Sequence, residues 1–306
     1  MISGKARISM GVFSAVFGLC AFAQSPATPI PTSINAKLVL DAAGPAQRKS
    51  LKAIYLIICP NVEAGSGFLL ESGTMVTNSH VVATCTEETL IGIGTANKQV
   101  RFSRVIKDAD RDLALLIPTE KLVNGLKLAE TDNPPPGTPV TTWGYPFIYN
   151  GASPLLSVGY VAGFREVTPD NAKDKKIKHI IVNGAFNHGN SGGPLLIAQE
   201  NEVIGVVVLT YNFYPAGLKR LIDQLSAQKF GMQWAFTQPD GSKQNVSEAQ
   251  ITAAILDEFY QKTQVMIGEA IGASELVAML KEHSSELPAL RPAAVNPPTA
   301  LSATVK

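Results

Sequence analysis

The 306-residue sequence has little net charge and few aromatic residues. Its 26 Lys and Arg residues nearly balance its 25 Asp and Glu residues, which leaves a formal net charge of +1. A balanced chain has no electrostatic reason to bind nucleic acid or an anionic membrane surface. Aromatic residues make up only 7% of the chain, and they do not alternate with arginines in any stretch. Nucleic acid is therefore not an expected partner.

The sequence also lacks the spacing of histidines and cysteines that binds a metal, since it has only four His and three Cys in all. No metal or other cofactor is expected. Charged residues make up 17% of the chain and hydrophobic residues 45%, a balance typical of folded globular proteins. The length suffices for one large domain or two small domains, each with a core.

The N-terminus has the pattern of a cleaved secretory signal peptide at residues 1–23. Lys5 and Arg7 precede an uncharged run that ends in the small-x-small sequence Ala21-Phe22-Ala23. This run is short for a membrane span, so we expect export to the periplasm or the medium, with no membrane attachment after cleavage near Ala23. A lipoprotein is disfavoured, because the residues before Cys20 match a lipobox poorly.

Cleavage would leave two cysteines, Cys59 and Cys85, in an exported protein. Such a pair more often forms a disulfide than two free thiols, although buried free thiols remain an alternative. The bridge would close a loop of 85 − 59 = 26 residues. In the chain-entropy model, closing a loop of that size stabilises the fold by about 3 kcal/mol.

Short β-type runs separated by Gly, Asn and Asp fill most of the chain, which predicts an all-β protein. The proline-rich stretch 131–138 cannot lie inside a strand or helix and divides these runs into two halves. We expect a loose lead-in at 24–50 and two six-stranded β-barrels at 51–130 and 139–240. The expected strands are 53–58, 65–70, 74–77, 89–93, 100–106, 113–117, 139–144, 155–163, 177–182, a run around 195, 203–210 and 231–236.

Helical patterns occur only late in the chain. Apolar spacing predicts a short amphipathic helix at 216–229. A capping box, Ser247-Glu248-Ala249-Gln250, begins a C-terminal helical segment predicted at 247–282. The Pro-, Ala-, Ser- and Thr-rich stretch 284–306 is expected to be a disordered tail.

The sequence 187–194, Asn-His-Gly-Asn-Ser-Gly-Gly-Pro, places Ser191 between glycines. Glycines allow the backbone to approach a substrate closely, so neighbouring N–H groups can point at one oxygen. A serine hydroxyl is a weak nucleophile unless a base activates it and a carboxylate orients that base. A catalytic role for Ser191 therefore requires a histidine and an aspartate elsewhere in the chain.

Of the four histidines, His80 is the candidate base, because it follows a β-type run inside the expected disulfide loop. His179 lies in a charged stretch and is expected to face solvent. His188 is too close to Ser191 in sequence to act as its base, although it could contact a substrate, and His283 lies near the C-terminal tail.

Asp112 is the candidate carboxylate, because it leads directly into the apolar run 113–117 and should be buried at the start of a strand. The neighbouring Asp108 and Asp110 are expected to be turn residues.

Four motifs occur in this order: GSGF at 65–68, TNSHVV at 77–82, DADRDLALL at 108–116 and GNSGGPL at 189–195. In these motifs the sequence resembles the trypsin-like (chymotrypsin-fold) serine proteases, and most of all the bacterial HtrA/Deg-type protease domain. The resemblance implies a double β-barrel that hydrolyses protein or peptide substrates through an acyl-enzyme, without a cofactor. It also implies that His80 is the general base, Asp112 orients it, Ser191 is the nucleophile, and the N–H groups of Gly189 and Ser191 form the oxyanion hole.

The sequence departs from the HtrA pattern after Phe236, where the remaining 306 − 236 = 70 residues lack the strands that a PDZ domain needs. The insertion 213–229 leaves the details of substrate binding open. Six residues before Ser191 stands Ala185, where trypsin-type enzymes that select Lys or Arg have an acidic residue. We therefore expect a preference for small or aliphatic side chains.

Two other functions are alternatives to a serine protease. The motif G-x-S-x-G also occurs in α/β-hydrolases, but that fold needs a helix after the serine and a later histidine. Here Pro194 and a β-type run follow, and the only later histidine is His283. The second alternative is a catalytically silent or latent protein of the same fold that mainly binds peptides or proteins. The oligomeric state is left open.

Overall fold

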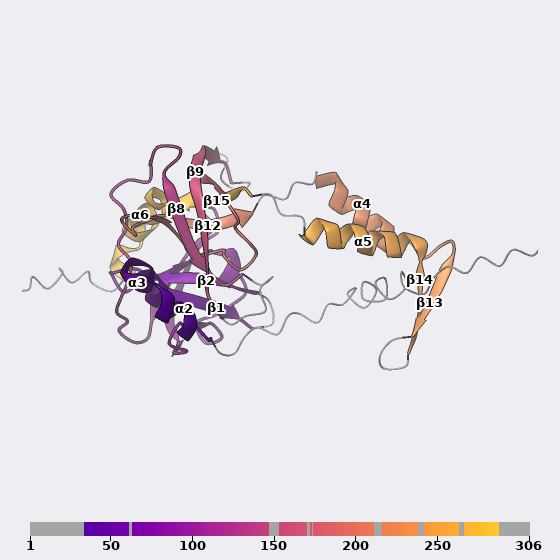
Figure 1. Cartoon of the computed structure of the whole chain (residues 1–306), viewed down its shortest axis with the longest axis horizontal. Coiled ribbons are helices and arrows are strands. Elements are labelled where there is room, and N and C mark those ends of the chain that lie inside the picture. Colours follow the sequence, from indigo (N-terminus) through magenta and orange to yellow (C-terminus); the bar gives the residue numbers. More distant parts are fainter. Residues whose placement is uncertain are drawn as a thin grey trace, which may run out of the picture.

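The computed structural model describes residues 34–60, 63–146, 153–169, 172, 174–210, 216–237, 242–262 and 266–287. The predicted signal peptide and nearly all of the predicted tail lie outside these residues. Two β-barrels pack against each other, and a smaller unit of two helices and two strands projects from one of them (Figure 1). Among the described residues, no helix is both long and apolar enough to span a membrane.

The first barrel is a single sheet of seven strands that is nearly closed. The strand order is β5-β4-β1-β2-β3-β7-β6. Six strands were predicted; the seventh arises because the predicted strand 100–106 is divided into two. The strands are β1 (Ile54–Cys59), β2 (Glu63–Leu69), β3 (Met75–Thr77), β4 (Ile91–Gly94), β5 (Gln99–Val100), β6 (Phe102–Asp108) and β7 (Leu113–Pro118).

The second barrel is closed, with six strands in the order β10-β15-β12-β11-β8-β9. Its sixth strand was predicted at 231–236, and this prediction is wrong: the barrel is closed by β15, which pairs with both β12 and β10. The barrel therefore extends beyond the predicted boundary 139–240. The strands are β8 (Pro139–Gly144), β9 (Leu155–Val167), β10 (Ile177–Gly184), β11 (Pro194–Ile197), β12 (Val203–Thr210) and β15 (Gly268–Gly272).

The projecting unit is inserted between β12 and β15 and is called the arm below (Figure 1). It contains α4 (Ala216–Ala227), β13 (Gln233–Thr237), β14 (Lys243–Ser247) and α5 (Glu248–Lys262). Helix α4 confirms the helix predicted at 216–229. The predicted capping box is also confirmed, because the Gln250 N–H donates to Ser247 Oγ (3.2 Å) and the Ser247 N–H donates to Gln250 Oε1 (3.0 Å).

The predicted C-terminal helical segment 247–282 contains two helices, α5 and α6 (Ala273–Glu282), separated by the buried strand β15. A short 3₁₀ turn, η3 (Ser284–Glu286), follows α6. The prediction joined the helices because apolar residues continue at helical spacing through β15. The strand forms nonetheless because pairing on both edges satisfies its backbone polar groups inside the barrel.

The predicted loose lead-in 24–50 is wrong for its described part, where α2 (Lys37–Ala42) and α3 (Pro45–Ala53) form. Helix α3 begins with a proline in its first turn, a position where proline costs no backbone hydrogen bond. Its last turn buries Leu51 and Ala53 against the core. The composition of this segment suggested a linker, but burial of these apolar side chains orders it.

The linker between the barrels contributes Asp132, which is buried. One carboxylate oxygen accepts hydrogen bonds from the N–H and hydroxyl of Ser274 in the first turn of α6, at 2.9 and 2.6 Å. The other oxygen lies 2.5 Å from Lys178 Nζ. Burial alone would raise the pKa of Asp132, but the hydrogen bonds from Lys178 and Ser274 outweigh it and lower the pKa. The linker carboxylate thus fastens α6 to the second barrel.

Candidate active site

His80 and Asp112 are brought together by the pairing of β3 with β7. His80 begins a 3₁₀ turn, η2 (His80–Val82), just after β3, and Asp112 directly precedes β7. Because Thr77 pairs with Ala114 in antiparallel register, the end of β3 lies beside the start of β7. His80 Nδ1 lies 2.7 Å from Asp112 Oδ2, and the His80 backbone N–H donates to Asp112 Oδ1 at 2.9 Å. Both carboxylate oxygens therefore hold one histidine.

The backbone of Asp112 is fixed in an uncommon conformation. Its φ is +53°, a left-handed value that residues other than glycine seldom adopt. The Asp112 carbonyl accepts hydrogen bonds from Asn78 Nδ2 (2.9 Å) and from the Ser79 N–H (3.2 Å). Its side chain was expected to be buried but remains 29% exposed, and the imidazole of His80 is 42% exposed. The pair is thus partly open to solvent.

Ser191 lies in the loop between β10 and β11, and this loop packs against the first barrel. The Ser191 carbonyl accepts a hydrogen bond from the Ser66 N–H at 2.8 Å, and its hydroxyl donates to the Val208 carbonyl at 3.3 Å. The next residue, Gly192, has φ +85°, and a Cβ there would lie 2.1 Å from the Ser66 carbonyl oxygen and 2.3 Å from Thr77 Oγ1. Only glycine fits. The serine loop therefore lies against β2 and β3, and β3 leads directly to His80.

The two backbone groups predicted for the oxyanion hole are available as donors. Among the residues that the structure describes, the N–H groups of Gly189 and Ser191 donate no hydrogen bond to another protein atom. Gly189 has φ +97°, and its carbonyl accepts a 2.6 Å hydrogen bond from Ser66 Oγ. Ser66 Oγ in turn accepts a hydrogen bond from the Tyr145 N–H at 3.0 Å. The peptide groups around Gly189 are thus fixed by a side chain of the first barrel.

Sequence reasoning missed the contribution of Ser66. The signal available was the GSGF motif, in which a small polar residue stands between glycines in a strand of the core. Its hydroxyl is buried, so it must find hydrogen-bond partners, and both partners come from the second half of the chain. Those partners are 123 and 79 residues away in sequence, which no local pattern reveals.

His179 was expected to face solvent, and this prediction is wrong. Its side chain is buried in β10, with Nδ1 2.7 Å from Glu269 Oε1 in the neighbouring strand β15. Arg165 Nε donates to the same oxygen at 2.5 Å. Burial acts to raise the pKa of Glu269, but the hydrogen bonds from His179 and Arg165 lower it. This cluster belongs to the second barrel, and the charged stretch before it misled the prediction.

The other predicted residues of this region are placed as follows. His188 is exposed on the serine loop, and His283 directly follows α6, where its Nδ1 lies 2.8 Å from Glu286 Oε1. Asp110 lies in the turn that precedes Asp112, and Asp108 ends β6. Among the described residues, His80 is the histidine that contacts a carboxylate near the serine loop. In the described part of the chain, no group of three or more His, Cys, Asp or Glu residues could hold a metal ion.

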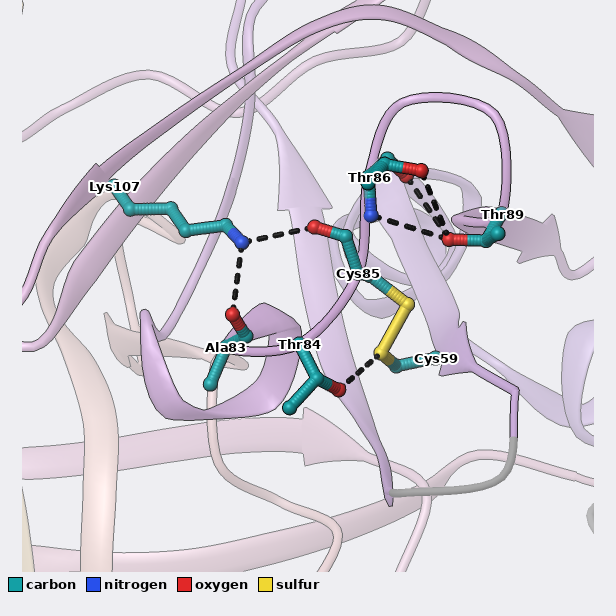
Figure 2. The surroundings of a disulfide bond; sticks show 7 residues. All are labelled: Cys59, Ala83, Thr84, Cys85, Thr86, Thr89 and Lys107. Atoms are coloured by element: carbon teal, nitrogen blue, oxygen red, sulfur yellow. Dashed lines mark hydrogen bonds between the residues drawn. A yellow bond between two sulfur atoms is a disulfide. The ribbon is translucent and has the colours of Figure 1, made fainter.

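A disulfide joins Cys59 to Cys85 and closes the loop that contains His80 (Figure 2). Lys107 Nζ donates to the carbonyls of Ala83 (3.0 Å) and Cys85 (2.8 Å), and Thr84 Oγ1 lies 3.5 Å from the Cys59 sulfur (Figure 2). The segment that follows η2 is therefore fastened both covalently and by a lysine from β6.

The family profile described as "Trypsin-like peptidase domain" matches residues 65–206, a range that includes His80, Asp112 and Ser191. This part of the chain is similar to trypsin-like peptidase domains. Similar proteins include serine protease HTRA3 of Rattus norvegicus, 31% identical over 157 residues, and serine protease HTRA4 of Homo sapiens, 32% identical over 150 residues. These alignments cover 48% and 47% of this chain. They span only 33% and 30% of the relatives, about a third of their length.

Solved structures share the fold of the double barrel. The active form of the Rv3671c protease from M. tuberculosis superposes with a TM-score of 0.53 at 17% identity, covering 95% of this chain and 96% of that one. The HtrA-type protease AlgW with a tripeptide gives a TM-score of 0.54 at 17% identity, covering 79% of this chain and 63% of that one. The predicted chymotrypsin-like double barrel is therefore confirmed.

Proposed function

We propose that the protein is a serine endopeptidase that hydrolyses protein or peptide substrates through an acyl-enzyme. Ser191 is the nucleophile, His80 the general base and Asp112 the residue that orients His80. The observation that carries this proposal is the two-point contact of Asp112 with His80, at 2.7 and 2.9 Å, in a domain whose serine loop packs against β3. A carboxylate that binds both the ring and the backbone of one histidine fixes its rotamer and tautomer.

The proposed reaction follows from this arrangement. Ser191 Oγ attacks the substrate carbonyl while His80 Nε2 takes its proton, and Asp112 stabilises the resulting imidazolium. The negative charge that develops on the carbonyl oxygen is stabilised by the N–H groups of Gly189 and Ser191. His80 then protonates the leaving amine, which departs and leaves the acyl-enzyme. Water attacks the ester with His80 again acting as base, and Ser191 is released.

The preference for small or aliphatic side chains is proposed for the residue before the cleaved bond. Its support comes from Phe186, whose buried ring lies against Gly268 of β15: a Cβ on Gly268 would lie 2.2 Å from Phe186 Cδ2. The ring belongs to the buried core of the second barrel, and we propose that it also bounds the substrate pocket next to Ala185, the position where a basic-residue specificity would require a carboxylate. A pocket bounded by a phenylalanine and without a carboxylate at position 185 would favour small apolar side chains.

Export is also proposed. The N-terminal sequence favours it, a disulfide persists best in an oxidising compartment, and one relative from Halomonas elongata, 30% identical over 143 residues, is named "Probable periplasmic serine endoprotease DegP-like". Fractionation of producing cells, with N-terminal sequencing of the product, tests this point. Cleavage near Ala23 and recovery outside the cytoplasm would support it, and an intact N-terminus in the cytoplasm would contradict it.

The activity is tested by incubating the purified protein with an unfolded polypeptide and identifying new termini by mass spectrometry. We expect cleavage by the native protein and none by Ser191→Ala. A third sample, Ser226→Ala, alters an exposed serine of the arm and should cleave as the native protein does. A native protein that binds the polypeptide without cutting it would favour the binding function instead.

A further inference from the structure

Arg111, the residue before Asp112, has a buried side chain surrounded by carboxylates. Its side chain is 9% exposed. Nη1 and Nη2 donate to the two carboxylate oxygens of Glu282 at 2.8 and 2.7 Å, which is the bidentate geometry that guanidinium groups form best. Nη1 also donates to Asp108 Oδ2 at 2.6 Å, and Nε lies 3.4 Å from Glu275 Oε2.

Glu275 and Glu282 both belong to α6, which follows the last strand of the second barrel. They are seven residues apart, so they lie two turns apart on one face of the helix. Glu275 also accepts a 3.2 Å hydrogen bond from the Lys178 N–H in β10. The guanidinium of Arg111 therefore ties a turn of the first barrel to a helix that the second barrel holds in place.

This tie acts on the turn that places Asp112. Asp108 closes the turn, because its Oδ1 accepts the Arg111 N–H at 3.0 Å while its Oδ2 accepts Nη1. Asp112 follows with its left-handed φ of +53°, a conformation that persists only where its surroundings enforce it. On one side Asn78 and Ser79 bind its carbonyl, and on the other side Arg111 anchors the preceding residue.

The carboxylates that contact Arg111 carry the charge that such an anchor needs. The hydrogen bond from Arg111 lowers the pKa of Glu282. For Asp108, burial acts to raise the pKa, but hydrogen bonds from Arg111 lower it. Asp108 and Glu282 are thus held in their charged form beside Arg111, and Lys175 Nζ lies 3.8 Å from Asp108 Oδ2 in the same cluster. Removing the Arg111 guanidinium would leave Glu275 and Glu282 without the cation that they share, and Asp108 with the more distant Lys175.

We propose that Arg111 is a positioning residue, which uses its ion pairs with α6 to hold Asp112 in the geometry that orients His80. The expected effect of Arg111 on kcat rests on the proposed function, whereas its effect on the position of Asp112 does not. Arg111→Met should therefore misplace the carboxylate and lower kcat by between about 10-fold and about 100-fold, because small misplacements of reacting groups have effects of that size. KM should change less than about twofold, since Arg111 contributes to positioning and not to substrate contact.

The chain offers a matched control in Arg104, which lies on β6 and pairs with Glu286 of η3. Like Arg111, it joins the first barrel to the C-terminal segment, but it is 55% exposed and stands opposite Ile117, away from the turn at Asp112. Arg104→Met thus removes a link between the same parts of the molecule without altering the surroundings of Asp112.

The experiment records the proton NMR spectrum of the full chain and the steady-state kinetics of native protein, Arg111→Met, Arg111→Lys and Arg104→Met. A proton in a short imidazole–carboxylate hydrogen bond resonates well downfield of the amide protons, so it reports the His80–Asp112 contact without any turnover. We expect this resonance to be lost or shifted in Arg111→Met and unchanged in Arg104→Met. Arg111→Lys keeps the charge but not the bidentate fork, so its kcat should be intermediate.

An unchanged resonance and kcat in folded Arg111→Met would overturn the inference. If Arg111→Met fails to fold, Glu282→Gln decides, because it weakens the fork and leaves Arg111 in place. A shifted resonance with a lower kcat in Glu282→Gln would support the inference. A native resonance together with a native kcat in Glu282→Gln would overturn it. If the native protein shows no turnover that depends on Ser191, the proposed function fails while the resonance still decides the role of Arg111.

Discussion

Ser66 Oγ donates a 2.6 Å hydrogen bond to the carbonyl oxygen of Gly189 and so joins the first barrel to the serine loop of the second. Stabilising a developing oxyanion depends on N–H groups that are already oriented before the reaction. Because a peptide group is planar, fixing the Gly189 carbonyl restricts the peptide plane that it shares with Asn190. The backbone N–H of Ser66 holds the Ser191 carbonyl at 2.8 Å as well. One residue of β2 thus binds the loop at two points.

The first prediction concerns Ser66→Ala, which leaves the Gly189 carbonyl without this donor. We expect kcat to fall by about 10-fold or more with little change in KM, since loss of an oxyanion donor itself costs about 100-fold to 1,000-fold. Steady-state kinetics on a peptide substrate measure the effect.

The control for that variant is Ser50→Ala, which also removes a buried serine hydroxyl. The Ser50 hydroxyl bonds Asn201, which lies outside the candidate active site. Both variants should lose about 1–3 kcal/mol of stability through an unsatisfied buried partner. Equal kcat values in the two variants would show that Ser66 serves only the fold.

The second prediction concerns substrate preference and Phe186. Phe186→Ala removes the ring that is proposed to bound the substrate pocket, so the enzyme should accept larger apolar side chains before the cleaved bond. Relative kcat/KM for substrates with Phe and Val at that position should rise by about 10-fold to 100-fold in favour of Phe. Competition assays with the paired substrates measure this ratio. An unchanged ratio would mean that Phe186 is only a core residue, and a preference of the native protein for Lys or Arg would contradict the proposed pocket.

The third prediction concerns Asp132 and pH. The pKa of Asp132 is lowered in the folded protein, so its stabilising contribution is present above its unfolded pKa, about 3.9, and is lost as pH falls through the lower folded value. Asp132→Asn should therefore cost about 2 kcal/mol at pH 7, where the charged hydrogen bonds are intact, and much less at pH 2. Urea unfolding at the two pH values measures the difference.

As a control, Asp41→Asn removes the exposed ion pair between Asp41 and Lys37. It should leave the stability nearly unchanged, and a cost for Asp132→Asn that did not shrink in acid would contradict the assignment.

The fourth prediction concerns the arm. Thr210 of β12 and Gly268 of β15 face each other in antiparallel register, so the arm leaves and re-enters the barrel at paired positions. Its helices and strands pack on one another around Ile222 and Ala253. Replacing residues 211–267 by an Asn-Gly turn should therefore leave a folded double barrel, because that dipeptide closes a two-residue hairpin.

Near-UV circular dichroism and thermal unfolding test the arm deletion. We expect a cooperative transition and native-like aromatic signals. A second deletion closed by a longer Gly-Ser linker separates strain in the turn from loss of support by the arm. Failure of both deletions to fold would show that the arm is part of the barrel's stability.

Local patterns predicted much of the fold, because buried strands need runs of branched apolar residues and turns need Gly, Pro, Asn or Asp. The predicted strands 139–144 and 203–210 coincide with β8 and β12. Strand β15 was missed because its Gly-Glu-Ala-Ile-Gly sequence has little β propensity of its own, and it forms only by pairing on both edges.

The candidate site divides in the same way. His80, Asp112 and Ser191 could be proposed because each lies in a short motif beside a strand boundary. The residues that surround them could not be predicted, because Ser66, Arg111 and His179 bind partners that are distant in the sequence. Arg111 meets Glu282 over 171 residues and His179 meets Glu269 over 90. Such contacts depend on how the barrels and α6 pack, which local sequence does not encode.

The most direct measurement of the proposed function is covalent labelling by a fluorophosphonate probe, which reacts with an activated serine. Labelling rates should be compared for the native protein, Ser191→Ala, His80→Ala and the control Ser226→Ala. We predict rapid labelling of the native protein and of Ser226→Ala, and no labelling of Ser191→Ala. The labelling rate of His80→Ala should be at least about 1,000-fold lower than that of the native protein. Equal, slow labelling of all four proteins would contradict the proposal that His80 and Asp112 activate Ser191.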